Sequence, residues 1–283
     1  MALTQLRWKK RKNMGSFPFC GDIERSPEHF IADERRLRRV ATVCTRDSRI
    51  GTYPVRTDRE TFDMTDQQPR STRADRRSDV WARIHAERAA LAADLADLPA
   101  QRFATPSLCA GLTVREVLAH LTAAASLNGW RWFAGVVRCR FDFDKQVTMR
   151  LNEQLGADPA ETLERFRAVV TSHTKPPLPL PAMLGETIVH GEDIRRPLGL
   201  RHTYPIETVT RVAEYYRGTD QVVVAKGRIG GLRLVATDGP FAHGTGALVS
   251  GTTLALTMAM TGRDTYCDEL SGAGVPILRE RMG

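Results

Sequence analysis

The chain has 283 residues, of which 42% are hydrophobic and 26% are charged, and this composition excludes collagen-like, mucin-like and wholly disordered proteins. No run approaches the ~18 apolar residues that a membrane-spanning helix needs, so we expect no membrane partner. The five cysteines are widely scattered and form no C-x-x-C pair. They therefore exclude a disulfide framework or a Cys-rich zinc site, and they indicate a reducing cytoplasm.

The net charge of +8 is concentrated in residues 1–77, which hold 18 of the 41 basic and 11 of the 33 acidic side chains. One interpretation is a basic arm that binds nucleic acid. We favour a disordered or non-native extension, because the segment has neither sustained apolar periodicity nor a groove-reading motif. Met64 precedes a polar run, and one hypothesis is that it is the native start. The remainder is nearly neutral, which argues against specific nucleic-acid binding.

Two helices are predicted in the first half of the folded part. Apolar residues at helical spacing predict a helix over residues 79–98, ended by Pro99. Thr113 and Glu116 form a capping box, in which each side chain satisfies a free backbone N–H of the other. They start a second helix that runs through His120 toward residues 130–137.

Two further helices complete the predicted bundle. Asp158 followed by a proline is typical of a helix start, and it predicts a third helix. A proline-rich connector at residues 175–181 leads to a fourth helix over residues 182–196, stopped by Pro197 and Gly199. Four helices of this size predict a bundle domain.

The pattern changes after residue 200. We expect a helix over residues 206–217, strands at 221–225 and 232–237, and a final helix over residues 252–261. The predicted fold class is therefore α+β. The domain prediction is an extension at 1–77, a four-helix bundle at 78–200 and a smaller α+β domain at 201–283.

Glu186 and His190 lie four residues apart, so one helical turn places them on the same face. With His120 from the second helix they offer two nitrogens and one carboxylate, a donor set that catalytic zinc sites use. Asp193 and Glu192 are competing ligands on the same helix. The alternative interpretation is that these histidines are hydrogen-bonded residues of the bundle core.

Two long segments are similar to a known family. The sequences SLCAGLTVREVLAHL at 107–121 and ETIVHGEDIRRPLG at 186–199 resemble the mycothiol-dependent maleylpyruvate isomerase family, a branch of the DinB-like metal-binding four-helix bundles. GLRLVATD at 231–238 and residues 254–263 resemble its C-terminal domain. The resemblance covers about residues 78–281. It implies one divalent metal, zinc, held by His120, Glu186 and His190.

The resemblance also implies mycothiol as a thiol cosubstrate and a small electrophile as substrate. Coordination to Zn²⁺ deprotonates a thiol, and the thiolate then adds to a double bond or displaces a leaving group. The first reaction gives an isomerase and the second an S-transferase. No catalytic acid or base is identified, and Arg131 and Arg138, candidates for the site, are more typical of exposed helix charges. The alternatives are a non-catalytic metal-binding regulator and a metal-assisted hydrolase with Asp193 as its base.

Overall fold

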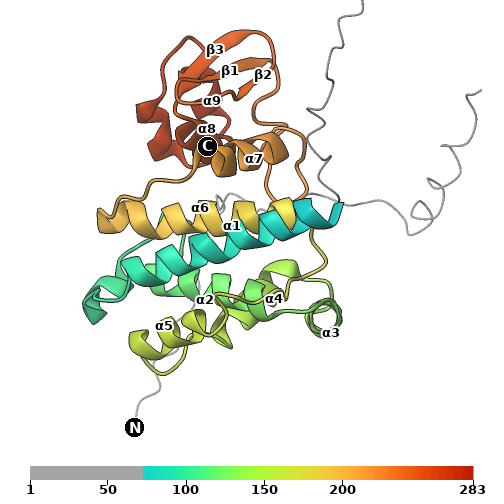
Figure 1. The fold of residues 1–283 in the computed structure, drawn as a ribbon, viewed down its shortest axis with the longest axis vertical. Coiled ribbons are helices and arrows are strands. Elements are labelled where there is room, and N and C mark those ends of the chain that lie inside the picture. Colours follow the sequence, from blue (N-terminus) through green and yellow to red (C-terminus); the bar gives the residue numbers. More distant parts are fainter. Residues whose placement is uncertain (1–72, 283) are drawn as a thin grey trace, which may run out of the picture. The chain divides into compact units, whose positions relative to one another are not determined.

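The computed structural model describes residues 73–282, which form helices and one small three-stranded sheet (Figure 1). The predicted α+β fold class is confirmed. Most of the basic arm, including Met64, lies outside the described residues. Over the described part of the chain, no helix has both the length and the apolar character that a bilayer crossing requires.

Four helices make up the bundle. They are α1 (Arg73–Asp94), α2 (Val114–Ser126), α5 (Pro159–Arg167) and α6 (Leu180–Leu198). Helix α6 packs against both α1 and α2, and α2 also packs against α5. In Figure 1, α1 and α6 lie side by side as a middle layer, with α2 and α5 below them. Fully buried side chains such as Leu91, Leu118 and Phe166 fill the space between the helices.

The helix predicted to start at Thr113 and to run through His120 toward residues 130–137 is instead two helices. Helix α2 ends at Ser126, and α3 (Gly129–Arg138) starts after a break. Leu127 has an extended backbone, and the Asn128 side chain accepts the backbone N–H of Arg131, so Asn128 caps a new helix. The first predicted helix is also shifted, since α1 begins at Arg73 and ends at Asp94.

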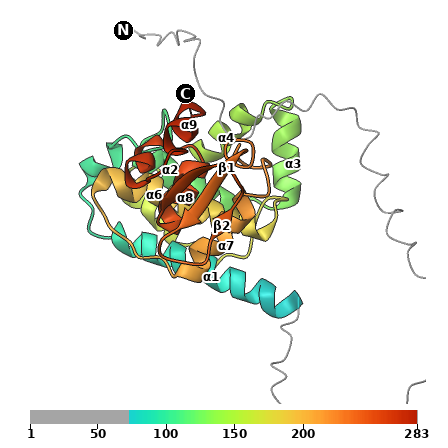
Figure 2. The same cartoon turned by 90° about the horizontal axis from the view of Figure 1, so that it is seen from above.

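A further helix, α4 (Phe143–Asn152), was not predicted. The Asp142 side chain caps it by accepting the backbone N–H of Lys145. Arg140 and Phe141 both have a left-handed backbone, with φ of 55° and 64°, and they turn the chain between α3 and α4. Figure 2 shows these two helices next to each other at one margin of the described part.

The end of α6 also differs from the prediction. Pro197 lies inside the last turn, and the helix ends at Gly199, which has a φ of 70°. A proline has no N–H to donate to the carbonyl four residues back, here that of Asp193. The backbone N–H of Leu108 donates to that carbonyl instead, at 3.1 Å. The loop before α2 is therefore attached directly to α6.

The C-terminal part combines short helices with the sheet. Its elements are α7 (Ile206–Tyr216), β1 (Leu232–Ala236), β2 (Ala242–His243), β3 (Ala247–Gly251), α8 (Thr253–Met260), a 3₁₀ helix (Asp264–Glu269) and α9 (Val275–Glu280). Another 3₁₀ helix (Ala100–Ala104) lies in the bundle, between α1 and α2. The strand order is β2-β1-β3, with β2 antiparallel and β3 parallel to β1. Helix α8 contacts β1 and β3 on one side and α7 on the other.

The strand predicted at residues 221–225 does not form. The Asp220 carboxylate accepts the backbone N–H groups of Ala225 and Gly227, which holds this segment as a loop. One apolar cluster extends from α1 and α6 into the C-terminal part and includes Ile84, Ile188 and Leu256. The two parts therefore share a core, and the domain boundary at residue 200 stays a prediction.

Candidate metal centre

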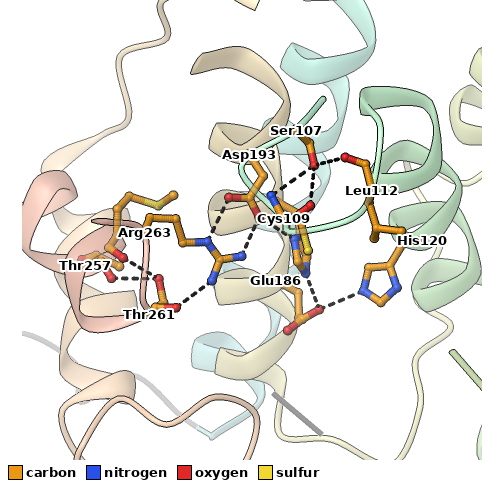
Figure 3. A network of polar contacts seen from close by, with 11 residues as sticks. Ser107, Cys109, Leu112, His120, Glu186, Asp193, Thr257, Thr261 and Arg263 are labelled. Carbon is orange, nitrogen blue, oxygen red and sulfur yellow. Dashed lines mark hydrogen bonds and ion pairs between the residues drawn. The ribbon is translucent and has the colours of Figure 1, made fainter. Parts of the chain in front are cut away.

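The structure brings together the three residues that the sequence singled out. His120 lies on α2, and Glu186 and His190 lie one turn apart on α6. The Nε2 atoms of His120 and His190 lie 3.4 Å and 3.3 Å from Oε2 of Glu186. Figure 3 shows the His120 ring and the Glu186 carboxylate directed toward each other from their two helices. One donor atom from each residue lies within 4.8 Å of the others.

Local features of both helices fix these positions. The predicted capping box is present at the start of α2, where Thr113 accepts the N–H of Glu116 and Glu116 accepts the N–H of Thr113. On α6, Gly185 allows the Tyr216 ring to approach the backbone beside Glu186. A Cβ at that position would lie only 2.5 Å from the Tyr216 hydroxyl oxygen. The glycine therefore lets α7 close over the helix that carries two of the three donors.

A charged pair behind His190 orients its ring. Oδ2 of Asp193 lies 2.9 Å from Nδ1 of His190. Arg263 donates Nε–H to Oδ1 of Asp193 at 2.9 Å and Nη2–H to Oδ2 at 2.5 Å, as Figure 3 shows. With its Nδ1 side occupied by Asp193, His190 directs Nε2 toward Glu186. Arg263 follows α8, so the C-terminal part helps to hold a bundle residue in place.

The charges of this centre are strongly coupled. Burial alone would raise the pKa of Glu186, but the positive charge of His190 and hydrogen bonds from both histidines lower it well below its usual value. Burial alone would lower the pKa of His190, but Glu186 and Asp193 raise it to about 10.

A second group of donors, Cys109, His190 and Asp193, also lies within 4.8 Å. Burial raises the pKa of the Cys109 thiol. Both oxygens of Asp193 are already bound by Arg263, and although burial opposes it, that charge holds the pKa of Asp193 at about 2. Asp193 is thus neither a free ligand nor an effective base for hydrolysis.

The other competing ligand, Glu192, points to a different face of α6. Its two carboxylate oxygens accept the hydroxyl groups of Tyr204 and Tyr266, at 2.7 Å and 2.6 Å. These contacts use the carboxylate for packing between α6 and the C-terminal part. Glu192 therefore does not contribute to the candidate centre.

A pocket opens next to His120 and Glu186, between α2, α3, α4 and the proline-rich connector. Arg150 on α4 lines it, and the sequence analysis missed this residue together with its helix. The signal was available, because Asp142 before Phe143 is a helix cap of the same kind as Asp158. The two arginines that were predicted as candidates, Arg131 and Arg138, are exposed and do not line this pocket.

Residues 84–175 match the family model described as the mycothiol maleylpyruvate isomerase N-terminal domain. The resemblance inferred from the sequence is confirmed. The part matched to this N-terminal domain includes His120 and the pocket residues of α2, α3 and α4, and it ends before Glu186 and His190.

Two solved structures are also similar to the chain. They are titled as the mycothiol-dependent maleylpyruvate isomerase and a histidine-to-alanine mutant of it. The first is 12% identical and the mutant 11%, and each alignment covers 70% of this chain and 92% of the other at a TM-score of 0.45. No curated protein matches the chain.

Proposed function

We propose that the chain is a cytoplasmic, divalent-metal-binding, mycothiol-dependent enzyme of the maleylpyruvate isomerase type. In the reaction that such an enzyme would catalyse, the thiolate of mycothiol adds to an electrophilic small molecule. His120, Glu186 and His190 hold the metal, and Zn²⁺ suits two imidazoles and one carboxylate. The observation that carries the proposal is the convergence of these three side chains from two helices.

The spacing of the donors supports a metal better than direct contacts between them. A tetrahedral ion with bonds of ~2.0–2.2 Å separates its ligands by ~3.3–3.6 Å. The separations of 3.4 Å and 3.3 Å between the imidazole nitrogens and the Glu186 oxygen match this edge length. The same distances are longer than the ~2.7–3.2 Å of ordinary N–H···O hydrogen bonds.

When bound, the metal supplies a Lewis acid that favours the thiolate form of a coordinated thiol. The chain's own residues position the reactants. Asp193 and Arg263 keep Nε2 of His190 directed at the centre, and the apolar pocket beside His120 keeps water from the reacting electrophile. If elimination of the thiol follows addition, the product is an isomer; if the adduct is released, the enzyme is a transferase.

The test is whether the purified full chain consumes mycothiol with a panel of electrophiles, with and without a chelator. We expect consumption that stops on chelation, returns with Zn²⁺, and is lost in Glu186→Gln. Glu192→Gln is the matched control on the same helix and should retain the activity. A protein that binds metal but consumes no mycothiol with any electrophile would contradict the proposal and favour a non-catalytic metal-binding role.

A further inference from the structure

The pocket beside the candidate centre has an apolar wall. Trp132 on α3 and Phe143 on α4 face it, and their rings stack with centroids 6.3 Å apart and planes 29° from parallel. Leu127, Leu178 and Met183 complete much of the remaining wall. Flat aromatic groups and a thioether favour contact with an apolar ring, and they cannot replace the water around a charged group.

The pocket wall contains few polar groups, and most of them already form hydrogen bonds within the protein. Besides His120 and Glu186, the polar residues of the described lining are Gln146 and Arg150. The Gln146 amide donates to the carbonyl of Trp132 at 2.9 Å. Arg150 uses Nη2 for the carbonyl of Arg131, at 2.6 Å, and Nη1 for the carboxylate of Glu153, at 3.0 Å.

One donor of this pocket lining, on Arg150, has no partner among residues 73–282. The Nε–H group of Arg150 is buried and makes no hydrogen bond with any of them. Gly135 makes room for this guanidinium, since a Cβ there would lie 2.9 Å from Nη2 and 3.3 Å from Nε. This Nε–H group has almost no accessible surface, so an acceptor on a bound ligand does not reach it, and the pocket offers its ligand mainly apolar contacts.

We propose that the substrate bound in this pocket is an electrophile with a flat apolar ring that packs against Trp132 and Phe143. A small dicarboxylate would bring two charged groups into a pocket whose guanidinium is already paired with Glu153. The pocket therefore selects ring-bearing substrates over small dianions such as maleyl compounds. This inference rests on the proposed function only in placing the reacting carbon of the electrophile next to His120 and Glu186.

The test compares two unreactive probes, benzoate and maleate, by isothermal titration calorimetry on the purified full chain. Benzoate carries a flat ring and one carboxylate, whereas maleate is a small dianion. We expect benzoate to bind about tenfold more tightly than maleate. Trp132→Ala should remove most of that preference, because Trp132 supplies an aromatic face of the pocket.

Trp130→Ala is the matched control. Trp130 lies two residues away on the same helix, is 76% exposed and does not line the pocket, so its loss should leave both dissociation constants unchanged. Ala124→Leu, which narrows the pocket from α2, provides a second variant and should weaken benzoate binding about tenfold. Circular dichroism checks that each variant is folded.

Maleate binding as tight as benzoate binding, or equal effects of Trp132→Ala and Trp130→Ala, would overturn the inference. The assay contains no thiol, so these results are independent of the reaction with mycothiol. A chain that prefers benzoate but never consumes mycothiol overturns the proposed function alone. A chain that consumes mycothiol without this preference overturns the inference alone.

Discussion

Helix α6 carries two buried glutamates, and their surroundings differ in one respect. Glu186 is 9% exposed and Glu192 is 6% exposed, so burial does not separate them. Both oxygens of Glu192 accept short hydrogen bonds from tyrosine hydroxyls. Glu186 has two imidazole nitrogens at 3.3–3.4 Å from one of its oxygens, too far for strong hydrogen bonds.

This difference distinguishes a carboxylate that is hydrogen-bonded within the fold from one that is a candidate metal ligand. Glu192 has its partners within the fold and joins α6 to the C-terminal part. Glu186 is paired with two side chains that are themselves metal ligands by type, at a spacing that leaves room for an ion. The two glutamates therefore differ in the type of side chain that contacts them and in the contact distances. They do not differ in the helix that carries them or in their burial.

The largest expected effect is on metal content. His190→Ala removes one of three proposed ligands and should reduce bound metal, measured by inductively coupled plasma mass spectrometry, from about one equivalent to almost none. His202→Ala is the control, because His202 pairs with Glu87 elsewhere in the structure. Full metal content in the His190 variant would show that His190 belongs to the core and not to a metal centre.

Substitution of Glu192 should lower the free energy of unfolding and not the metal content. Glu192→Gln turns one acceptor oxygen into an amide donor that faces a tyrosine hydroxyl, and the free energy of unfolding in urea should fall by about 2 kcal/mol. Metal content should stay unchanged. The exposed residue Glu207 provides a control, since Glu207→Gln should change stability by less than about 0.5 kcal/mol. Loss of metal in Glu192→Gln would contradict the separation of the two sites.

A smaller effect is expected when one donor to Glu192 is removed. Tyr266→Phe deletes the hydroxyl that donates to Oε2 and retains the ring, over which the Arg196 guanidinium lies 4.5 Å from the centroid. The free energy of unfolding should fall by about 1 kcal/mol, because one hydrogen bond is lost and the packing remains. An unchanged urea midpoint would show that this hydrogen bond adds nothing to stability.

The smallest effect concerns the second group of donors. Cys109→Ala should leave metal content unchanged, because Asp193 is bound by Arg263 and the Cys109 group therefore lacks a free carboxylate. The same mass-spectrometric measurement, made beside His190→Ala, decides between the two groups. A large loss of metal in the cysteine variant would assign the ion to Cys109 in place of His120.

Much of the bundle and the placing of Glu186 and His190 on one helical face were predictable from local patterns, whereas the approach of His120 was expected only from the family resemblance. The cap at Asp158, the capping box at Thr113 and the four-residue spacing from Glu186 to His190 each depend on interactions within one turn. Such signals are read from a few neighbouring residues. The strand at residues 232–237 was found in the same way, and the structure has β1 over Leu232–Ala236.

The elements that were missed depend on contacts from distant residues or on one side chain. The break before α3 comes from Asn128 capping a new helix, and the loss of a strand at 221–225 comes from Asp220. No local pattern shows that Arg263, 70 residues beyond Asp193, binds it. The position of Arg150 in the pocket likewise follows from the packing of α4 against α2.

The Leu108 N–H donates to the carbonyl of Asp193, which has no donor within the helix because residue 197 is a proline. This contact affects which substitutions the protein can accept. It joins the loop before α2 to α6 through main-chain atoms, next to Cys109 and six positions before the C-cap of α6. Because the contact uses only main-chain atoms, substitution of the Leu108 side chain leaves the loop before α2 joined to α6.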